Sequence, residues 1–179
     1  FGRISPVRVR RSSVVNKVLH KANCDVAVFK SREDLSKLKE MMVPIGPQVR
    51  GERLSVASKI LKKSGAFGEL VHVVTPDDNA EDGEELLRKT KELMDGEMET
   101  KLLKSSSVLR GLLNESREMD LIVVGPGKEW VFDRFLFGRT ADNLTNRVSC
   151  SVLMFKSKEH AMVAWSRGLI KAIMDKVKG

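Results

Sequence analysis

The sequence feature that most limits the possible folds is a regular alternation of short apolar runs with amphipathic stretches. Five candidate strands lie at residues 41–45, 70–74, 97–103, 121–124 and 151–155. Segments with apolar residues at helical spacing lie between them, at residues 48–64, 80–94, 107–118 and 139–148. Several of the runs are apolar throughout, which is typical of strands covered on both faces. The pattern therefore predicts an α/β fold in three layers, with a doubly wound, parallel, five-stranded sheet between helices.

A sheet of this kind also predicts where a ligand binds. In doubly wound sheets the ligand lies beyond the carboxyl ends of the strands, at the point where the strand order reverses. The loops that follow Ile45 and Val124 come directly after two of the apolar runs. These two loops are therefore the candidate binding loops.

Charge is distributed unevenly along the chain, which has a formal net charge of +8. Residues 1–32 carry +7 and residues 157–179 carry +3, whereas residues 33–156 carry −2. A nucleic-acid-binding domain usually shows a basic stripe on its folded face, so the nearly neutral centre argues against a nucleic-acid partner. Basic ends are compatible with an anionic membrane surface, with an acidic partner or with solvent alone.

The residue types used in catalysis and metal binding do not cluster in the sequence. Cys24 and Cys150 are isolated, and His20, His72 and His160 are scattered, so we expect no structural zinc and no catalytic nucleophile. Isolated thiols suit a reducing compartment, and no apolar run approaches the roughly 18 residues that cross a bilayer. We therefore expect a cytoplasmic domain in which both cysteines are small buried thiols and His72 is a packed or hydrogen-bonded strand residue.

The beginning of the chain repeats a later segment. Residues 12–30 align without gaps to residues 138–156, and four positions are identical, among them the pair Cys24 and Cys150. Both segments have a helix-to-strand pattern. We interpret residues 1–32 as the last helix and strand of a preceding, truncated repeat, and the chain as the C-terminal part of a tandem protein.

Four segments resemble the universal stress protein family in their order and spacing. They are Lys39–Pro47 (KEMMVPIGP), Gly68–Val74 (GELVHVV), Met119–Gly125 (MDLIVVG) and Ser151–Lys156 (SVLMFK). The resemblance covers residues 36–157 and implies the universal stress protein or adenine-nucleotide α-hydrolase-like fold for that domain.

The ATP-binding branch of that family carries a glycine, two residues, a glycine, nine residues, a third glycine and then Ser or Thr. Here Gly125 and Gly138 occupy the first and third glycine positions, but Lys128 and Arg139 replace the second glycine and the hydroxyl residue. Gly127 lies one position before Lys128. Glycines allow phosphate to approach backbone N–H groups closely, whereas lysine and arginine bind phosphate by charge.

The resemblance implies ATP or AMP as the ligand, held by residues that follow the first and fourth strands of the domain. The family's aspartate after its first strand corresponds to Gly46, so that contact to the nucleoside is missing here. The candidate nucleotide-binding residues are Pro44, Gly46, Val124, Gly125, Gly127, Lys128, Gly138, Arg139 and Thr140. Retained binding and a domain that has lost its ligand both stay open.

Members of the family pair through their fifth strands. The resemblance therefore implies either self-association through Ser151–Phe155 or pairing of that strand with Asp25–Phe29 within the chain, which would protect a sheet edge. The last segment, residues 158–179, has the spacing of an amphipathic helix. Packing of that helix on the domain is one interpretation, and contact with a membrane surface or a partner is the other.

The function expected from these features is regulatory and not enzymatic, because neither a general base nor a metal ligand set can be named. The first hypothesis is a universal-stress-like module that binds an adenine nucleotide through an altered phosphate loop. The alternative is the cytosolic C-terminal domain of an amino-acid permease or cation transporter, which acts in regulation or dimerisation without nucleotide. Such soluble tails occur in the family that the sequence resembles.

Overall fold

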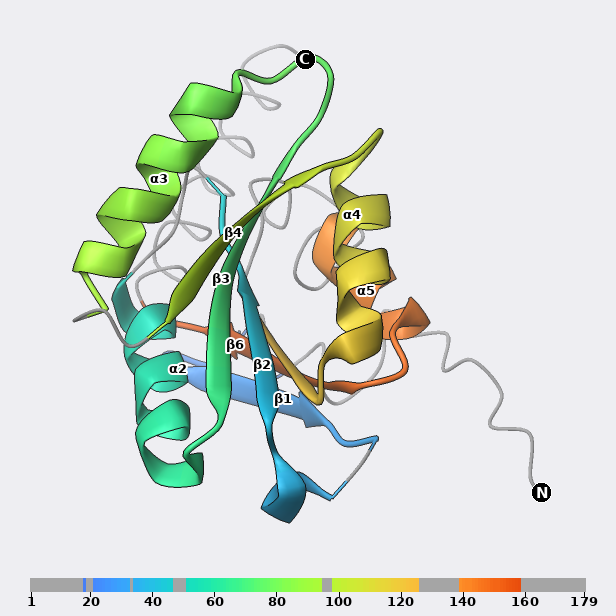
Figure 1. The fold of residues 1–179 in the computed structure, drawn as a ribbon. Coiled ribbons are helices and arrows are strands. Elements are labelled where there is room, and N and C mark those ends of the chain that lie inside the picture. The colour runs from blue at the N-terminus through green and yellow to red at the C-terminus, as the bar shows by residue number, and fades with distance from the viewer. Residues whose placement is uncertain are drawn as a thin grey trace, which may run out of the picture.

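The computed structural model describes residues 18, 21–32, 34–46, 51–94, 98–125 and 139–158. Helices α2 (Gly51–Ser64) and α3 (Ala80–Glu92) lie on one side of a sheet, and α4 (Val108–Glu115) and α5 (Arg139–Arg147) lie on the other (Figure 1). Two short 3-10 turns, η1 and η2, span Leu35–Lys37 and Ser116–Glu118. The three layers that the sequence predicts are present.

The sheet has six strands in the order β1-β6-β5-β2-β3-β4. Their bounds are Val26–Lys30 (β1), Glu40–Pro44 (β2), Phe67–Val74 (β3), Glu99–Lys104 (β4), Leu121–Val124 (β5) and Ser151–Lys156 (β6). The five strands from β6 to β4 are parallel, and only β1 runs antiparallel to its neighbour. The doubly wound parallel sheet is therefore confirmed, with β1 added as a sixth strand at its edge.

Successive residues of the central strands point to opposite faces of the sheet and fill two separate cores. Met42 and Ile122 pack on the α4–α5 side, whereas Met41 and Val123 pack on the α2–α3 side. All four side chains are fully buried. Apolar residues on both faces explain why these strands read as continuous apolar runs in the sequence.

Two strands differ from their predicted bounds. β3 begins at Phe67, before the predicted start, because Gly68 allows close packing: a Cβ there would lie 2.6 Å from Cδ1 of Leu61. β4 begins at Glu99, two residues after the predicted start. Met98 is buried but lies outside the ladder that pairs β3 with β4 from Glu99 onward.

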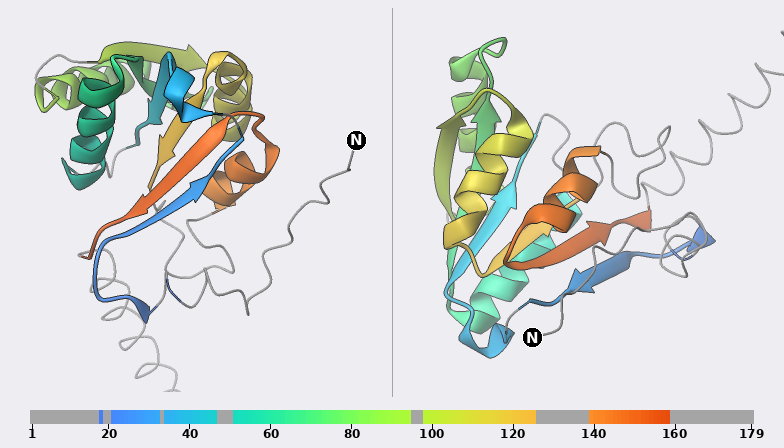
Figure 2. Two further views of the ribbon diagram at one scale, coloured as in Figure 1. Left: turned by 90° about the horizontal axis from the view of Figure 1, so that it is seen from below. Right: turned by 90° about the vertical axis from the view of Figure 1, so that its right-hand side faces the viewer.

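The strand β1 covers the edge of β6, as the views in Figure 2 show. Val26 is paired with Lys156 and Lys30 with Val152 in an antiparallel register. Two further hydrogen bonds hold the β1 segment in place: the backbone N–H of Lys158, after β6, donates to Asp25 (2.8 Å), and Lys30 Nζ donates to the carbonyl of Thr145 in α5 (2.6 Å). Of the two arrangements that the family resemblance implies, the intrachain pairing is present.

The structure corrects one expectation about the cysteines. Cys150 is buried as predicted, but Cys24 is exposed. Cys150 precedes β6, which has a strand on either side, whereas Cys24 precedes β1 at the edge of the sheet. His72 is hydrogen-bonded as predicted, with its Nδ1 3.0 Å from the carbonyl oxygen of Ile45.

Some predicted segments lie outside the described residues. They are most of the predicted N-terminal helix and the amphipathic segment after residue 158. Within the part of the chain that the structure describes, no helix is both long enough and apolar enough to span a bilayer.

Candidate functional site

The strand order reverses between β2 and β5, which lie side by side at the centre of the sheet. From β2 the chain continues outward to β3 and β4, and from β5 it continues in the other direction to β6. The carboxylate of Asp120 fixes this junction at the opposite, amino edge by accepting hydrogen bonds from the backbone N–H groups of Lys39 (2.8 Å) and Glu40 (3.0 Å). The carboxyl ends of β2 and β5 therefore form the position where a doubly wound sheet binds its ligand.

Hydrogen bonds hold the segment that follows β2 as far as Ile45, and the next residue, Gly46, has free space beside it. The N–H of Ile45 donates to the carbonyl of Val71 (2.8 Å), and His72 contacts the carbonyl of Ile45. A Cβ built at Gly46 would meet no atom within 4 Å. There is thus room for a side chain at Gly46, and the absence of the family's aspartate is not forced by crowding.

The residue that follows β5 is Gly125, and the side chain of Arg53 packs directly against it. A Cβ at Gly125 would lie 3.0 Å from Nη1 and 3.1 Å from Cδ of Arg53. Arg53 is the third residue of α2, the helix that follows β2. The helix therefore places a guanidinium at the carboxyl end of β5, and glycine leaves the space for it.

The environment of this guanidinium is unfavourable for a charge. Its Nε is buried and has no hydrogen-bond partner, and among the described residues Arg53 forms no ion pair. Burial lowers the pKa of Arg53 to about 10, which still leaves it charged at neutral pH. The first turn of a helix is the positive end of its dipole, where a cation is disfavoured. The sequence patterns did not point to Arg53, because no motif includes it.

The structure tests the position of only some candidate nucleotide-binding residues. Pro44 ends β2, Val124 ends β5, and Gly46 and Gly125 follow these strands, so the four lie at the same edge of the sheet. Arg139 and Thr140 are the first two residues of α5. The remaining three, Gly127, Lys128 and Gly138, lie outside the described residues.

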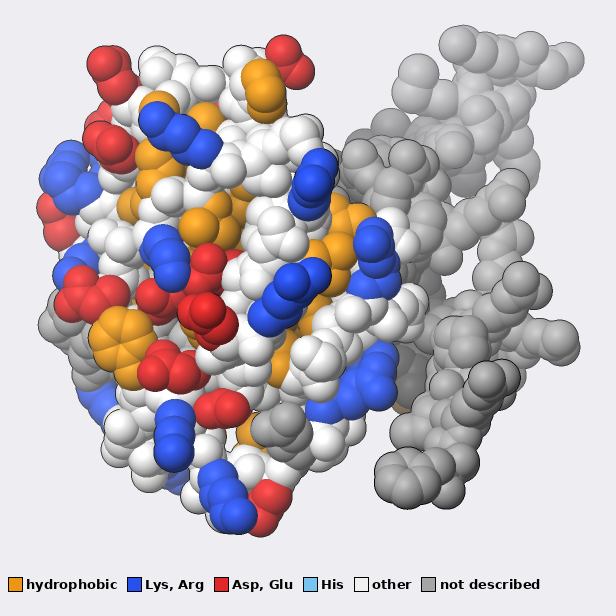
Figure 3. Space-filling model, turned by 45° about the vertical axis from the view of Figure 1, so that its right-hand side comes forward, with side chains coloured by type: hydrophobic (Ala, Val, Ile, Leu, Met, Phe, Trp, Pro, Cys, Tyr) orange, Lys and Arg blue, Asp and Glu red, His pale blue; other side chains and the backbone are white. Residues whose placement is uncertain are grey.

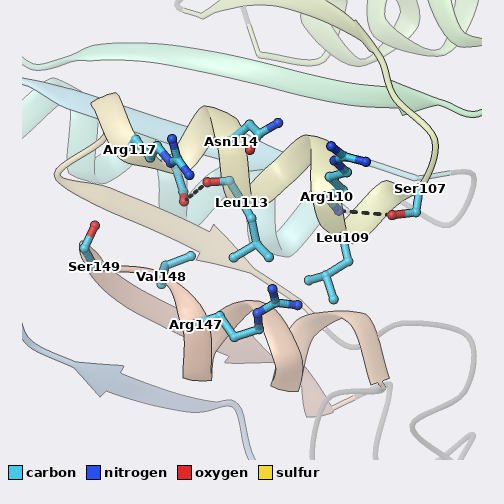
Figure 4. A pocket seen from close by; sticks show the side chains of 10 residues that line it. Ser107, Leu109, Arg110, Leu113, Asn114, Arg117, Arg147, Val148 and Ser149 are labelled. Carbon is cyan, nitrogen blue, oxygen red and sulfur yellow. Dashed lines mark hydrogen bonds between the residues drawn. The ribbon is translucent and has the colours of Figure 1, made fainter.

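A second candidate site is a cleft of about 530 Å³ between α4 and α5. Figure 4 shows Leu109 and Leu113 pointing toward α5, and Arg147 extending from α5 into the space below them. Arg110 and Arg117 also line the cleft, but they point away from α5 and do not converge with Arg147. All three arginines are exposed.

Ordinary helix electrostatics accounts for two of these arginines. Arg147 ends α5 and Arg117 lies in η2, directly after α4. Cations at helix carboxyl ends are favoured by the helix dipole. Arginine side chains that are exposed to water also carry little desolvation penalty. The cleft therefore offers less support for a specific ligand than the buried guanidinium beside Gly125.

The face drawn in Figure 3 shows no basic stripe, and the described side chains form no metal-binding cluster. Figure 3 shows acidic and basic side chains mixed across much of the face that it draws, rather than sorted into a basic stripe. Within the described parts of the chain, no three His, Cys, Asp or Glu side chains are grouped as a metal site requires.

Comparison with known proteins agrees with this geometry. The universal stress protein family matches residues 108–156, which run from α4 to the end of β6. The universal stress protein UspA from Lactobacillus plantarum has the same fold, with a TM-score of 0.57, 14% identity, and coverage of 67% of this chain and 99% of that chain. The family match thus covers the last helices and strands of the domain, and the solved structure shows the same fold. Among curated proteins, none matches the sequence.

Two further solved structures extend the comparison. The universal stress protein from Archaeoglobus fulgidus in complex with dAMP has a TM-score of 0.54 and 19% identity, and covers 66% of this chain and 98% of that one. The protein PA1789 from Pseudomonas aeruginosa, described as functionally unknown, has a TM-score of 0.60 and 15% identity. It covers 83% of this chain, but this chain covers only 57% of it. At these identities the comparisons establish the fold alone.

Proposed function

We propose that this universal-stress-type domain is a non-enzymatic regulatory module that binds an adenine nucleotide, ATP or AMP, at the carboxyl ends of β2 and β5. The observation that carries the proposal is the reversal of strand order between these strands, with Gly125 directly after β5. Ligands of doubly wound sheets bind at such a reversal. The dAMP complex of the A. fulgidus protein supports the ligand class.

In this proposal the phosphate groups lie near the start of α5, where backbone N–H groups and the positive end of the helix dipole favour an anion. Arg139 and Thr140 begin that helix, and Gly138 precedes it. Lys128, at the second glycine position of the family motif, would contribute charge in place of close backbone approach. Gly127 would keep part of the backbone freedom that the motif has lost.

Calorimetric titration tests this function directly. ATP, ADP and AMP are each titrated into the 179-residue chain, with and without magnesium. The expected result is saturable binding that weakens when Gly138 and Arg139 are replaced, for example by Gly138→Val and Arg139→Ala. Unchanged binding in these variants would contradict the role of the α5 start, and no heat up to millimolar nucleotide would reject the function.

A second candidate function is the cytosolic C-terminal domain of a membrane transporter, an amino-acid permease or a cation transporter, which works without nucleotide. The observation that favours it is the position of β1, which fills the edge of β6 that single modules of this family use for pairing. A strand from a preceding repeat in that place supports a tandem protein in which intrachain pairing replaces self-association. The basic segments 1–32 and 157–179 would face an anionic membrane surface.

The sequence of the parent gene tests this second function. About a dozen upstream apolar segments, each of roughly 20 residues, would support the transporter domain. A parent gene that encodes an upstream α/β repeat but no such segment would support a cytoplasmic tandem protein and reject the transporter.

A further inference from the structure

The guanidinium of Arg53 lies at the proposed binding edge, its Nε is buried, and no ion pair among the described residues includes it. Its Nη1 would be 3.0 Å from a Cβ at Gly125, so it lies against the backbone that follows β5. Its Nε is one of two buried side-chain polar atoms without a hydrogen-bond partner among the described residues. Among the described residues, this side chain forms no ion pair.

Such an arrangement is unfavourable in a protein that binds nothing there. Burial of a charged group is strongly unfavourable unless the charge is paired, and most buried polar side chains do have a partner. Arg53 also lies in the first turn of α2, where the backbone N–H groups add positive potential. The buried Nε, the helix N-terminus and the lack of an ion pair to Arg53 among the described residues together favour an anion at this position.

We propose that Arg53 binds an oxyanion, the phosphate of the bound nucleotide, at the carboxyl end of β5. This inference rests on the proposed nucleotide-binding function and assigns the phosphate contact to a residue outside the family's glycine motif. A guanidinium presents paired N–H donors in a plane, which match two oxygens of one phosphate. Gly125 is then needed because a side chain there would crowd the guanidinium.

The position of the family's aspartate agrees with this change of ligand contact. That position is Gly46, so no side-chain carboxylate follows β2 there, while the Arg53 guanidinium lies at the end of β5. A carboxylate at this edge would compete with phosphate for the guanidinium. The described part of the site therefore favours recognition of the anionic group over recognition of the nucleoside.

Three ligands separate the phosphate contact from the nucleoside contact. Inorganic phosphate, AMP and adenosine are titrated by calorimetry into the 179-residue chain, into Arg53→Gln and Arg53→Lys, and into the matched control Arg147→Gln. Arg147 is an exposed arginine of the α4–α5 cleft, so its replacement makes the same change in net charge away from the site. Thermal unfolding of each variant shows that it is folded.

We expect Arg53→Gln to weaken the binding of AMP and phosphate by about tenfold or more. A hydrogen bond to a charged group typically contributes enough free energy for such a change in affinity. Arg53→Lys should recover part of the loss, and Arg147→Gln should bind like the parent chain. The inference would be overturned if folded Arg53→Gln bound AMP and phosphate as tightly as the parent chain does. It would also be overturned if Arg147→Gln lost as much affinity as Arg53→Gln.

The outcomes also separate this inference from the proposed function. Arg53-dependent phosphate binding with AMP no tighter than phosphate would support the inference and reject nucleotide recognition. AMP and adenosine binding that does not depend on Arg53 would support nucleotide recognition and overturn the inference. The absence of any binding at millimolar concentration would overturn both.

Discussion

Arg53 and Glu69 each carry a buried polar atom without a hydrogen-bond partner, but only Glu69 has a counter-charge from its own chain. Glu69 in β3 lies beside Lys101 of β4, whose Nζ is 3.7 Å from Glu69 Oε1 and 2.6 Å from Glu115 Oε1. Arg53 has no such neighbour among the described residues. In the β3–β4 cluster the charged side chains therefore have partners of opposite charge within the chain. In the proposed site at the carboxyl end of β5, a bound anion would supply the partner of Arg53.

The pKa values of the two regions show the same contrast. Burial raises the pKa of Glu69, but Lys101 acts in the opposite direction. The hydrogen bond to Glu115 raises the pKa of Lys101, so the ammonium is stabilised by the fold. For Arg53, burial lowers the pKa, and no ion pair among the described residues opposes this effect. Lys101 therefore stabilises the folded state, whereas Arg53 is expected to destabilise it in the absence of a bound anion.

The largest effect is expected from Arg53→Met, which tests whether the charge of Arg53 destabilises the folded state. Removal of an uncompensated buried charge in favour of an apolar side chain of similar length should raise the free energy of unfolding by about 1–3 kcal/mol in the absence of ligand. Urea unfolding at neutral pH measures the change. Phosphate should raise the melting temperature of the parent chain but not that of the variant. A marked loss of stability in Arg53→Met would instead make Arg53 a structural residue.

Lys101→Met should have the opposite sign. Without Lys101, the carboxylates of Glu69 and Glu115 lose their shared cation, and the protein should lose about 1 kcal/mol at neutral pH, since Lys101 is itself partly exposed and screened. Because the pKa of Lys101 is raised in the folded state, its contribution is present below pH 10.5 and is lost as the pH rises through the raised value. The loss caused by the substitution should be smaller above pH 10.5 than at pH 7, because Lys101 of the parent chain then loses its proton. Equal stability of variant and parent at pH 7 would contradict a stabilising role of Lys101.

Gly125→Ala should reduce ligand binding by only a few-fold. Its Cβ would meet Nη1 and Cδ of Arg53 at 3.0 and 3.1 Å, but the end of an arginine side chain can shift. The same substitution at Gly46, where nothing lies within 4 Å of a Cβ, is the matched control for steric effects. AMP titrations of both variants measure the difference, and a stronger loss for Gly46→Ala would contradict the assignment of phosphate to the β5 side.

The smallest effect is expected from Glu69→Gln. The folded state raises the pKa of Glu69 above its unfolded value, so the parent chain binds this proton more tightly when folded and loses stability as the pH rises through that window. Glutamine does not titrate. The variant should therefore gain about 0.5 kcal/mol relative to the parent at pH 7 and nothing at pH 3. A gain that is larger at pH 3 than at pH 7 would show that the sign is wrong.

The sequence predicts most of the fold because the folding determinants are local and repeated. Apolar runs such as Leu121–Val124 identify strands covered on both faces, and the repeat around Cys24 and Cys150 predicts the pairing of β1 with β6. The exposure of Cys24 was not predicted, because the repeat carries the residue but not the neighbouring strand that buries its counterpart. Two aligned residues can therefore have different environments when one precedes an edge strand and the other an inner strand.

The site was predictable only in part. The strand pattern places Gly46 and Gly125 at one edge, because carboxyl ends of neighbouring parallel strands meet there. Arg53 escaped prediction since it lies in an ordinary amphipathic helix, and the burial of a single nitrogen atom is a property of tertiary packing. The structure does not describe Gly127, Lys128 and Gly138, so their role stays a prediction from the family resemblance.

The most direct test of phosphate binding by Arg53 follows the NMR signal of its Nε–Hε group during titration with AMP and inorganic phosphate. The signal is assigned by its absence from the spectrum of Arg53→Gln, and those of Arg110, Arg117 and Arg147 serve as internal controls. We expect the Arg53 signal to shift saturably with both ligands, while the signals of the three cleft arginines stay in place. A stationary Arg53 signal at saturating AMP, or a larger shift at the cleft arginines, would contradict it.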